Sequence, residues 1–205
     1  MARTVVLASH NAHKIAEFEA ILAGVAGGLT VDAYDGPEPV EDGASFDENA
    51  LIKARAAAAH SGRVALADDS GIAVAVMGGA PGIFSARWAG THGDDTANRR
   101  LLLAQLRDMP EHHRAATFHC TIAVVVPGVE GAADREFVVH GVWPGTIATA
   151  ESGANGFGYD PVFIPEGSDV TAAELTPAEK NEQSHRARAF AALVPRLSEI
   201  FDATR

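Results

Sequence analysis

The chain has 205 residues, 47% of them hydrophobic and 21% charged, a composition that excludes wholesale disorder and suits one domain or two lobes sharing a sheet. Its 27 acidic and 16 basic side chains give a formal net charge of −11, which disfavours sequence-independent binding to nucleic acid because that binding depends on neutralising phosphates. The single cysteine excludes an internal disulfide and fits a reducing cytoplasm, and no apolar run reaches the roughly 18 residues that a membrane-spanning helix needs.

Apolar alternation and turn residues divide the chain into short strands and amphipathic helices. The expected strands, in chain order, cover residues 4–8, 29–31, 64–67, 72–76, 117–126, 136–143 and 146–150. The expected helices, in the same order, run from Asn11 onward, from Ser45 to about His60, from Asp94 or Asp95 through Leu106, from Thr176, and from about Ser184 to Phe201. The short apolar stretch at the start is expected to be an opening strand and not a signal peptide. This order predicts an α/β protein with a mixed sheet.

Local signals place several of these boundaries. Residues 45–48 and 176–179 have the pattern of capping boxes, in which a hydroxyl caps the helix and a glutamate reaches back. Asp68-Asp69-Ser70-Gly71 is expected to end the strand before it, and Pro144-Gly145 is expected to turn the chain between two strands. Pro195 is expected to kink or divide the last helix.

The segment from Ser9 to Lys14 straddles a strand end and a helix start. The first turn of a helix presents unpaired N–H groups and partial positive charge, so anions bind there, and Lys14 would add a full charge. This pattern favours a phosphate site. The alternative is a polar helix cap with a solvated lysine.

Acidic side chains form a second group. Asp68 and Asp69 follow an apolar strand, and such adjacent carboxylates repel, which raises one pKa unless a cation lies between them. Glu41, Asp42 and Glu48 add further oxygen ligands. Because proteins usually hold Mg²⁺ by carboxylates together with substrate phosphates, the group favours a magnesium site. The alternative is a turn whose aspartate caps the next element.

Glycines and aromatic residues are interspersed in residues 153–161, the first part of a loop expected to run from Gly153 to Pro165. Glycines allow close backbone approach, and the rings could stack on a planar ligand. The alternative places Phe157 and Tyr159 in the core. Lys180 and Arg186 are hydrogen-bond donors near a helix start, and their alternative is an exposed polar helix entrance.

Together these segments resemble the inosine/xanthosine triphosphate pyrophosphatases, which remove deaminated purine nucleotides. The matching stretches, in the family's order, are L-A-S-H-N-A-H-K, S-F-D-E-N-A-L-I-K-A, A-D-D-S-G-I, G-G-A-P-G-I-F-S-A-R-W-A-G, G-F-G-Y-D-P-V-F and A-E-L-T-P-A-E-K-N-E-Q-S-H-R. They run from Leu7 to Arg186. One departure is His10, which stands where the family commonly has glycine.

The resemblance implies an elongated central mixed sheet flanked by helices, in a single domain over residues 1–205 with two lobes and the active cleft between them. It implies a homodimer that hydrolyses ITP, dITP and XTP to the nucleoside monophosphate and pyrophosphate with Mg²⁺. No nucleic acid or membrane partner is expected, and the location is expected to be cytoplasmic. The alternatives are a pyrophosphatase of modified pyrimidine triphosphates and a non-catalytic nucleotide-sensing module.

The resemblance also implies a role for each site residue. Asp69 would be the general base and would hold Mg²⁺ together with Glu41. The residues that would bind the substrate are Ser9, His10, Asn11, Ala12, His13, Lys14, Ser70, Phe157, Gly158, Tyr159, Asp160, Lys180, His185 and Arg186. The division of metal and base roles among Glu41, Glu48, Asp68 and Asp69 stays open, and the sequence does not locate what would reject the 2-amino group of GTP.

Overall fold

The structure is a computed structural model that describes residues 3–9, 15, 18–19, 29–129 and 131–202. The chain divides into two compact units, which we call unit 1 and unit 2. Unit 1 comprises residues 1–69, 121–140 and 189–205, and unit 2 comprises residues 70–120 and 141–188. That the whole chain acts as one domain stays a prediction.

One six-stranded sheet, in the order β2-β1-β3-β4-β5-β6, runs through the fold. Its strands are β1 (Arg3–Leu7), β2 (Leu29–Ala33), β3 (Ala65–Val74), β4 (Ala115–Val126), β5 (Arg135–Ile147) and β6 (Phe163–Pro165). Strand β1 pairs in parallel with β2 and β3, whereas β5 and β6 are antiparallel. The predicted mixed α/β class is therefore confirmed.

Within the residues that the structure describes, four complete α-helices and four short 3₁₀ helices accompany the sheet. The α-helices are α2 (Phe46–Ser61), α3 (Asp95–Gln105), α4 (Pro177–Gln183) and α5 (His185–Asp202). The 3₁₀ helices are η1 (Ala75–Met77), η2 (Gly82–Arg87), η3 (Glu111–His113) and η4 (Asp160–Val162). Within the described ranges, no helix combines the length and the apolar character needed to cross a membrane.

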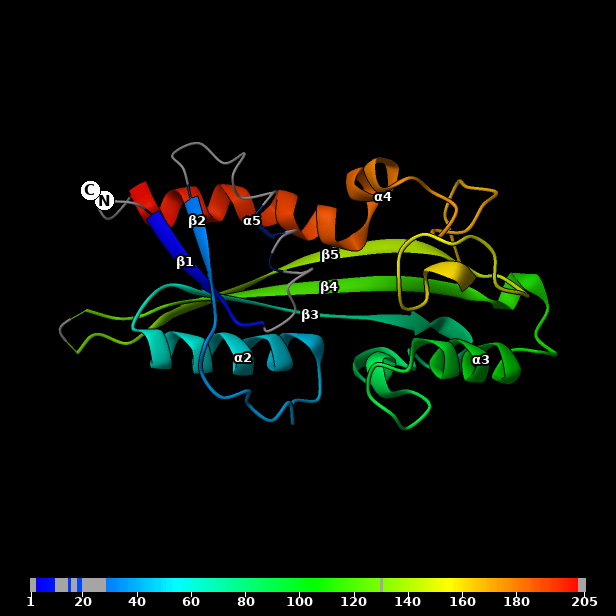
Figure 1. Ribbon diagram of the computed structural model, residues 1–205, viewed down its shortest axis with the longest axis horizontal. Helices are drawn as coiled ribbons and strands as arrows, with labels where there is room; N and C mark the ends of the chain where they lie inside the picture. The colour runs from blue at the N-terminus through cyan, green and yellow to red at the C-terminus, as the bar shows by residue number, and fades with distance from the viewer. Residues whose placement is uncertain (1–2, 10–14, 16–17, 20–28, 130, 203–205) are drawn as a thin grey trace. The chain divides into compact units, whose positions relative to one another are not determined.

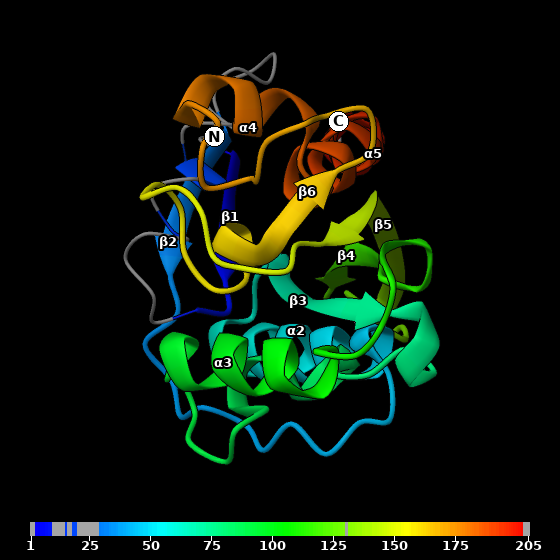
Figure 2. The same ribbon diagram turned by 90° about the vertical axis from the view of Figure 1, so that its right-hand side faces the viewer.

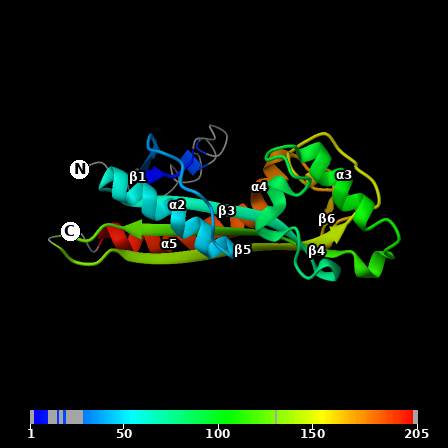
Figure 3. The same ribbon diagram turned by 90° about the horizontal axis from the view of Figure 1, so that it is seen from below.

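In unit 1, α2 and the C-terminal part of α5 cover opposite faces of the sheet (Figures 1 and 3). The face that α2 buries is made of alanines at positions 50, 54, 57 and 58, at helical spacing. They pack against Val6, Ala65 and Val125 of the sheet. Because alanine side chains are small, the helix backbone approaches the sheet closely, which brings short polar side chains on α2 within reach of β3.

In unit 2, α3 lies on one face of the sheet and α4 on the other (Figure 2). The core between them is largely aromatic and aliphatic, and it includes Leu102 of α3, Phe118 of β4, Trp143 of β5 and Phe163 of β6. The rings of Phe118 and Phe163 meet edge to face, with centroids 4.6 Å apart. This core fixes the strands from which the aromatic loop after residue 153 departs.

Arg114 lies in unit 2 with 2% of its surface exposed. Its guanidinium donates to the backbone carbonyls of Leu106 (2.6 Å), Ile147 (2.7 Å) and Ala148 (2.6 Å). Burial lowers the pKa of this guanidinium, but three carbonyl oxygens compensate the buried charge. Arg114 thus ties the end of α3 to the end of β5.

We expect Arg114→Met to lower the free energy of unfolding by about 3 kcal/mol, because buried carbonyls lose their charged donor. Urea unfolding followed by circular dichroism measures this. Arg107→Met, which changes an exposed arginine of the same segment, is the matched control and should stay within about 0.5 kcal/mol of wild type. Equal stabilities for the two variants would show that Arg114 contributes little.

The helix starts predicted near Ser45, Asp94, Thr176 and Ser184 are confirmed. The hydroxyl of Ser45 accepts from the N–H of Glu48 at 3.2 Å, and Thr176 and Glu179 form a complete capping box. The box at Ser45 differs in one detail, because Glu48 accepts from the N–H of Ala44 at 2.8 Å, one residue before the expected donor.

Two predicted strand ends are wrong. Strand β3 continues through Asp68–Gly71 to Val74, so the expected turn there and the separate strand over 72–76 do not exist. Strand β5 continues through Pro144-Gly145 to Ile147, which removes the expected turn and the strand over 146–150. Pro144 is tolerated because its carbonyl accepts from the N–H of Glu166 at 2.9 Å, and a proline needs only that carbonyl.

Three further expectations meet the structure in part. The loop expected from Gly153 to Pro165 ends in η4 and β6. Helix α5 is not divided at Pro195, which lies inside it. Of the helix expected from Asn11, the described residues Ile15, Phe18 and Glu19 are helical, and the rest lies outside the described ranges.

Candidate functional site

Unit 1 gathers three carboxylates around one ammonium. The Nζ atom of Lys53 lies 3.0 Å from Glu41 Oε1 and 3.5 Å from Asp69 Oδ1. The side chains of Lys53 and Asp69 are 12% and 14% exposed, and Asp68 beside them is buried. We call Glu41, Lys53, Asp68 and Asp69 the acidic cluster. Its charges interact strongly because little water separates them.

The electrostatics of the acidic cluster shift two pKa values upward. Burial raises the pKa of the Asp69 carboxyl; the Lys53 ammonium opposes this, and Glu41 and Asp68 add to it. Burial by itself would lower the pKa of Lys53, but Asp69, Asp68 and Glu41 together outweigh it, so this pKa is raised. Lys53 therefore stays charged at neutral pH, whereas Asp69 accepts a proton more readily than an ordinary aspartate.

Helix α2 supplies the side chains that organise this cluster. Asn49 and Lys53 lie four residues apart and so share one face of α2. The Oδ1 atom of Asn49 accepts from the N–H of Gly43 at 2.9 Å, which ties the loop that carries Glu41 to the helix. A side chain at Gly43 would collide with Asn49 and Glu48. The Asn49 side chain also acts on Asp69, whose pKa it lowers against the larger effects of burial and of the neighbouring carboxylates.

The sequence analysis did not assign roles to Lys53 or Asn49. The signal that could have found them is a polar pair at helical spacing within an otherwise alanine-lined buried face. Such a pair must meet a polar partner, because burying an unpaired charge is costly.

Asp68 and Asp69, which we call the acidic pair, lie beyond the carboxyl end of β1, although they are in the middle of their own strand, β3. Strand β1 ends at Leu7, whose partner on β3 is Leu66, and the N–H of Ala8 donates to the carbonyl of Leu66 at 2.8 Å. Asp68 and Asp69 therefore extend past this strand end, where ligands of α/β sheets usually bind. Ser9 follows directly. Residues His10, Asn11, Ala12, His13 and Lys14 lie outside the described ranges.

The acidic cluster fits a magnesium ion that a substrate helps to hold. In the part of the chain that the structure describes, no three histidine, cysteine, aspartate or glutamate side chains form a ready-made metal cage. However, Glu41 and Asp69 converge on the same ammonium, so their oxygens already meet where positive charge is favoured. Magnesium often binds one or two carboxylates and completes its shell with waters and phosphate oxygens.

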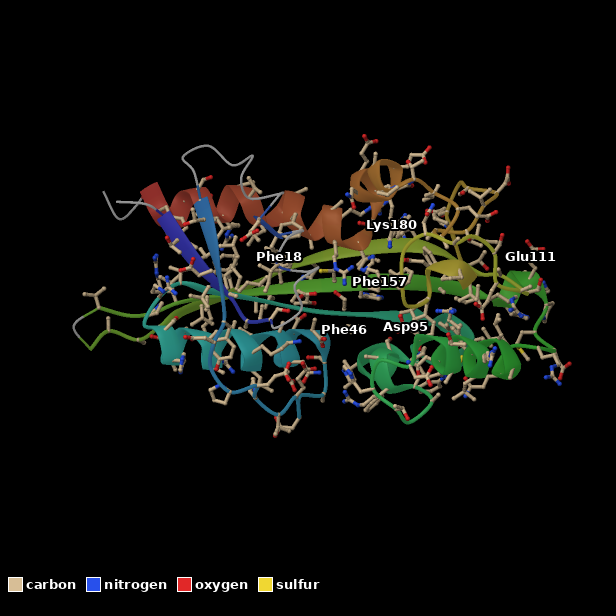
Figure 4. All side chains as sticks on the ribbon, in the orientation of Figure 1. Phe18, Phe46, Asp95, Glu111, Phe157 and Lys180 are labelled. Atoms are coloured by element: carbon tan, nitrogen blue, oxygen red, sulfur yellow. The ribbon has the colours of Figure 1, made fainter. Side chains whose placement is uncertain are left out.

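Unit 2 contains a pocket of about 130 Å³. Elements far apart in the sequence form it: the end of β3, the start of α3, the aromatic loop and the two C-terminal helices. Its lining residues are Ser70, Gly71, Ser85, Ala86, Asp95, Phe118, Phe157, Gly158, Tyr159, Asp160, Lys180, His185 and Arg186. The predicted substrate-binding residues from Ser70 onward are thus brought together. Figure 4 labels three of the lining residues, Asp95, Phe157 and Lys180.

The ring of Phe157 lies under two cations. Lys180 Nζ is 4.9 Å and the guanidinium carbon of Arg186 is 5.0 Å from its centroid. Phe157 is 57% exposed, so the alternative of a core position is wrong for it, whereas Tyr159 is buried and donates to the carbonyl of Ser85 at 2.8 Å. An exposed aromatic ring in a pocket is a surface on which a planar ligand can stack.

Asp160 organises the pocket from below. Its Oδ2 atom accepts from Lys180 Nζ at 2.5 Å and from the N–H of Phe157 at 2.8 Å. The carboxylate is buried, so it fixes both the cation and the loop backbone. His185 completes the wall, with its ring stacked on Phe118 at 4.8 Å between centroids and an angle of 10°.

Gly156 leaves room for that carboxylate. Its φ is 75°, in the left-handed region, and a Cβ there would overlap Asp160 Oδ2. For ITP, the substrate that the sequence resemblance implies, we expect Gly156→Ala to raise the KM about tenfold by displacing Asp160 from Lys180. Steady-state kinetics measures this, with Gly167→Ala as the control, because Gly167 has a similar φ of 80° but lies outside the pocket. An unchanged KM would show that Asp160 does not need its present position.

Helix α3 contributes two residues that the sequence analysis did not single out for binding. Asp95 accepts from the N–H of Gly158 at 2.8 Å, and Arg99 donates to the carbonyl of the same glycine at 2.8 Å. The expectation for Asp94 or Asp95 concerned only the helix cap, and Asp94 takes that part by accepting from the N–H of Ala97 at 2.9 Å.

Comparison with known proteins gives consistent matches over nearly the whole chain. A curated dITP/XTP pyrophosphatase of Leifsonia xyli subsp. xyli is 63% identical over 193 residues, which is 94% of each chain. The dITP/XTP pyrophosphatase of Nocardia farcinica is 54% identical over 209 residues, covering 100% of this chain and 98% of that protein.

Solved structures agree with these relatives. The Ham1 protein of Coxiella burnetii has a TM-score of 0.86 at 41% identity, over 96% of this chain and 99% of that one. The nucleoside-triphosphatase, or dITP/XTP pyrophosphatase, of Mycobacterium abscessus has a TM-score of 0.78 at 49% identity, over 94% and 99%. The model of the Ham1 family matches residues 5–196, and the resemblance noted in the sequence is confirmed: the chain belongs to the Ham1 family.

Proposed function

We propose that this protein hydrolyses the deaminated purine nucleotides ITP, dITP and XTP to the nucleoside monophosphate and pyrophosphate, with Mg²⁺. The observation that carries the proposal is the exposed Phe157 ring with Lys180 and Arg186 both about 5 Å from its centroid. The names of the relatives from Leifsonia xyli and Nocardia farcinica support the same substrate class.

The pocket in unit 2 would take the purine base. Lys180 and Arg186 donate hydrogen bonds and accept none. A 6-oxo group accepts hydrogen bonds, whereas the 6-amino group of ATP donates them. The base would stack on Phe157 and direct its 6-oxo group to these donors, and Gly158, Tyr159, Asp160 and His185 would shape the rest of the pocket.

The acidic cluster in unit 1 would serve the phosphates. Glu41 and Asp69 would hold Mg²⁺. When bound, this ion neutralises the negative charge of phosphate oxygens and so makes the phosphorus easier for water to attack. Lys53 would keep the two carboxylates ionised and close together. Asp69, whose pKa is raised, would take a proton from the water as its oxygen bonds to the α-phosphorus and the bond from that phosphorus to the departing pyrophosphate oxygen breaks.

The residues from Ser9 to Lys14 would bind phosphate oxygens next to the end of β1, with Ser70 following the acidic pair on β3. His10 introduces a side chain where the family commonly has glycine, so the loop would differ there. The homodimer and the cytoplasmic location stay predictions.

Pyrophosphate release from ITP, dITP, XTP, ATP and a modified pyrimidine triphosphate, each with Mg²⁺ or with a chelator, tests the proposal. We expect release from the three deaminated purine nucleotides only when Mg²⁺ is present. Faster release from the pyrimidine nucleotide would favour the first alternative. Tight ITP binding without pyrophosphate release would favour the nucleotide-sensing module.

A further inference from the structure

Gly158 is held on both sides by α3. Its N–H donates to Asp95 Oδ2 and its carbonyl accepts from Arg99 Nη1, each at 2.8 Å. Asp95 and Arg99 are four residues apart on α3 and so lie on the same face of the helix. Gly158 has a φ of 59°, a conformation that other residues rarely adopt. Two side chains of one helix thus hold the residue that follows Phe157 by hydrogen bonds to its N–H and its carbonyl.

A third residue, Glu151, holds the Arg99 side chain in place. Arg99 Nε donates to Glu151 Oε2 at 3.0 Å, and the Arg99 side chain is only 13% exposed. Burial raises the pKa of Tyr159, the Asp95 carboxylate raises it further and Arg99 lowers it, so both charges act on the residue after Gly158 as well. Charge-assisted hydrogen bonds of this kind are stronger than neutral ones and fix geometry.

The loop needs this support because Phe157 does not support itself. Phe157 is more than half exposed, so core packing does not fix its ring, whose orientation depends on the backbone beside it. Asp160 holds the N–H of Phe157, and α3 holds the next residue. Binding surfaces on loops reach useful precision only when surrounding groups lock them in place.

We propose that Asp95 and Arg99 are positioning residues for base recognition, which hold Gly158 so that the Phe157 ring is presented to the purine beside Lys180 and Arg186. This inference rests on the proposed function, because it takes the purine to bind in this pocket. Both residues act on base binding through their hydrogen bonds to Gly158, although Asp95 also lines the pocket, and neither serves the phosphates.

The test separates base binding from phosphate binding. We would measure the Kd of IMP by calorimetry and the inhibition constant of pyrophosphate in ITP hydrolysis. For Arg99→Ala and Asp95→Ala we expect IMP to bind about tenfold more weakly, while pyrophosphate inhibition stays within about twofold of wild type. Arg99→Lys, which keeps one donor for the Gly158 carbonyl, should recover part of the IMP affinity. Arg100→Ala, an exposed arginine next on α3, is the matched control and should not change either constant.

Each other outcome is informative. Unchanged IMP affinity in both alanine variants would overturn the inference, and so would an equal loss of IMP and pyrophosphate binding, which indicates general damage to the fold. If the wild-type protein hydrolyses ITP but the alanine variants bind IMP as tightly as wild type, the positioning role is wrong and the proposed function still holds. A wild-type protein that neither binds IMP nor hydrolyses ITP would remove the proposed function and this inference with it.

Discussion

Asp69→Asn is expected to lower kcat for pyrophosphate release from ITP by about 10²–10⁴-fold, because the amide cannot take a proton from water. The loss of a carboxylate that would hold Mg²⁺ adds to the effect. Asparagine has the shape of aspartate, so the contacts with Lys53 and Asn49 change in charge and not in space. Pyrophosphate release with saturating Mg²⁺ measures the change.

The fold should survive this substitution. In the folded protein the pKa of Asp69 is raised, so the folded state binds the proton more tightly than the unfolded state. Stability from this group is therefore complete below the pKa of an unfolded aspartate and falls as pH rises through the raised value. At neutral pH the ionised carboxylate costs stability, and a neutral asparagine removes that cost. We expect the variant to be at least as stable as wild type in urea at pH 7.

Asp42→Asn is the matched control, because Asp42 is an exposed aspartate beside Glu41 and outside the acidic cluster. Its turnover should stay close to that of wild type. Near-normal turnover in Asp69→Asn would move the general base elsewhere, with Asp68 and then Glu48 the next residues to test.

Local signals predicted most helix starts correctly, because a cap is made by residues adjacent in the chain. Ser45 and Thr176 cap helices as expected. The strand ends at Asp68 and Pro144 were predicted wrongly for one shared reason. Polar residues and prolines usually mark turns, but here neighbouring strands and loops supply partners that keep the chain extended, and those partners are distant in sequence.

The residues of the candidate site also fall into those that local sequence indicates and those whose role depends on distant partners. Residue types alone drew attention to Asp69, Phe157, Lys180 and Arg186. The role of Lys53 depends on α2 packing against β3 through alanines, and the polar pair of Asn49 and Lys53 on that helix face does not by itself say which carboxylates it meets. The resemblance gave Asp160 only as one of the substrate-binding residues, and the structure adds that its buried carboxylate is the partner of Lys180.

That pairing sharpens the prediction for the base. One donor of Lys180 is committed to Asp160, which leaves two for a ligand, while Arg186 is 7% exposed and brings a planar fork of donors. A 6-oxo purine would satisfy these donors. The 6-amino group of ATP would oppose donor to donor and leave buried polar groups unpaired, a situation that enzymes use to discriminate by about 10⁴-fold or more.

We therefore expect kcat/KM for ITP, dITP and XTP to exceed that for ATP by about 10⁴-fold, with ribose and deoxyribose both accepted. In Arg186→Ala the ratio of ITP to ATP should fall by at least about tenfold, because one reader of position 6 is gone. Lys180→Ala is a poorer test, because it would leave the buried Asp160 carboxylate without its cation. Arg188→Ala is the matched control: Arg188 is exposed, lies two residues away on α5, and donates to the carbonyls of Gln183 and Val142 outside the pocket.

If Arg186→Ala loses activity on ITP but keeps the wild-type ratio, Arg186 binds the nucleotide without reading position 6. Equal kcat/KM for ITP and ATP in the wild-type protein would exclude the donor pair as the source of specificity, since stacking on Phe157 accepts every base.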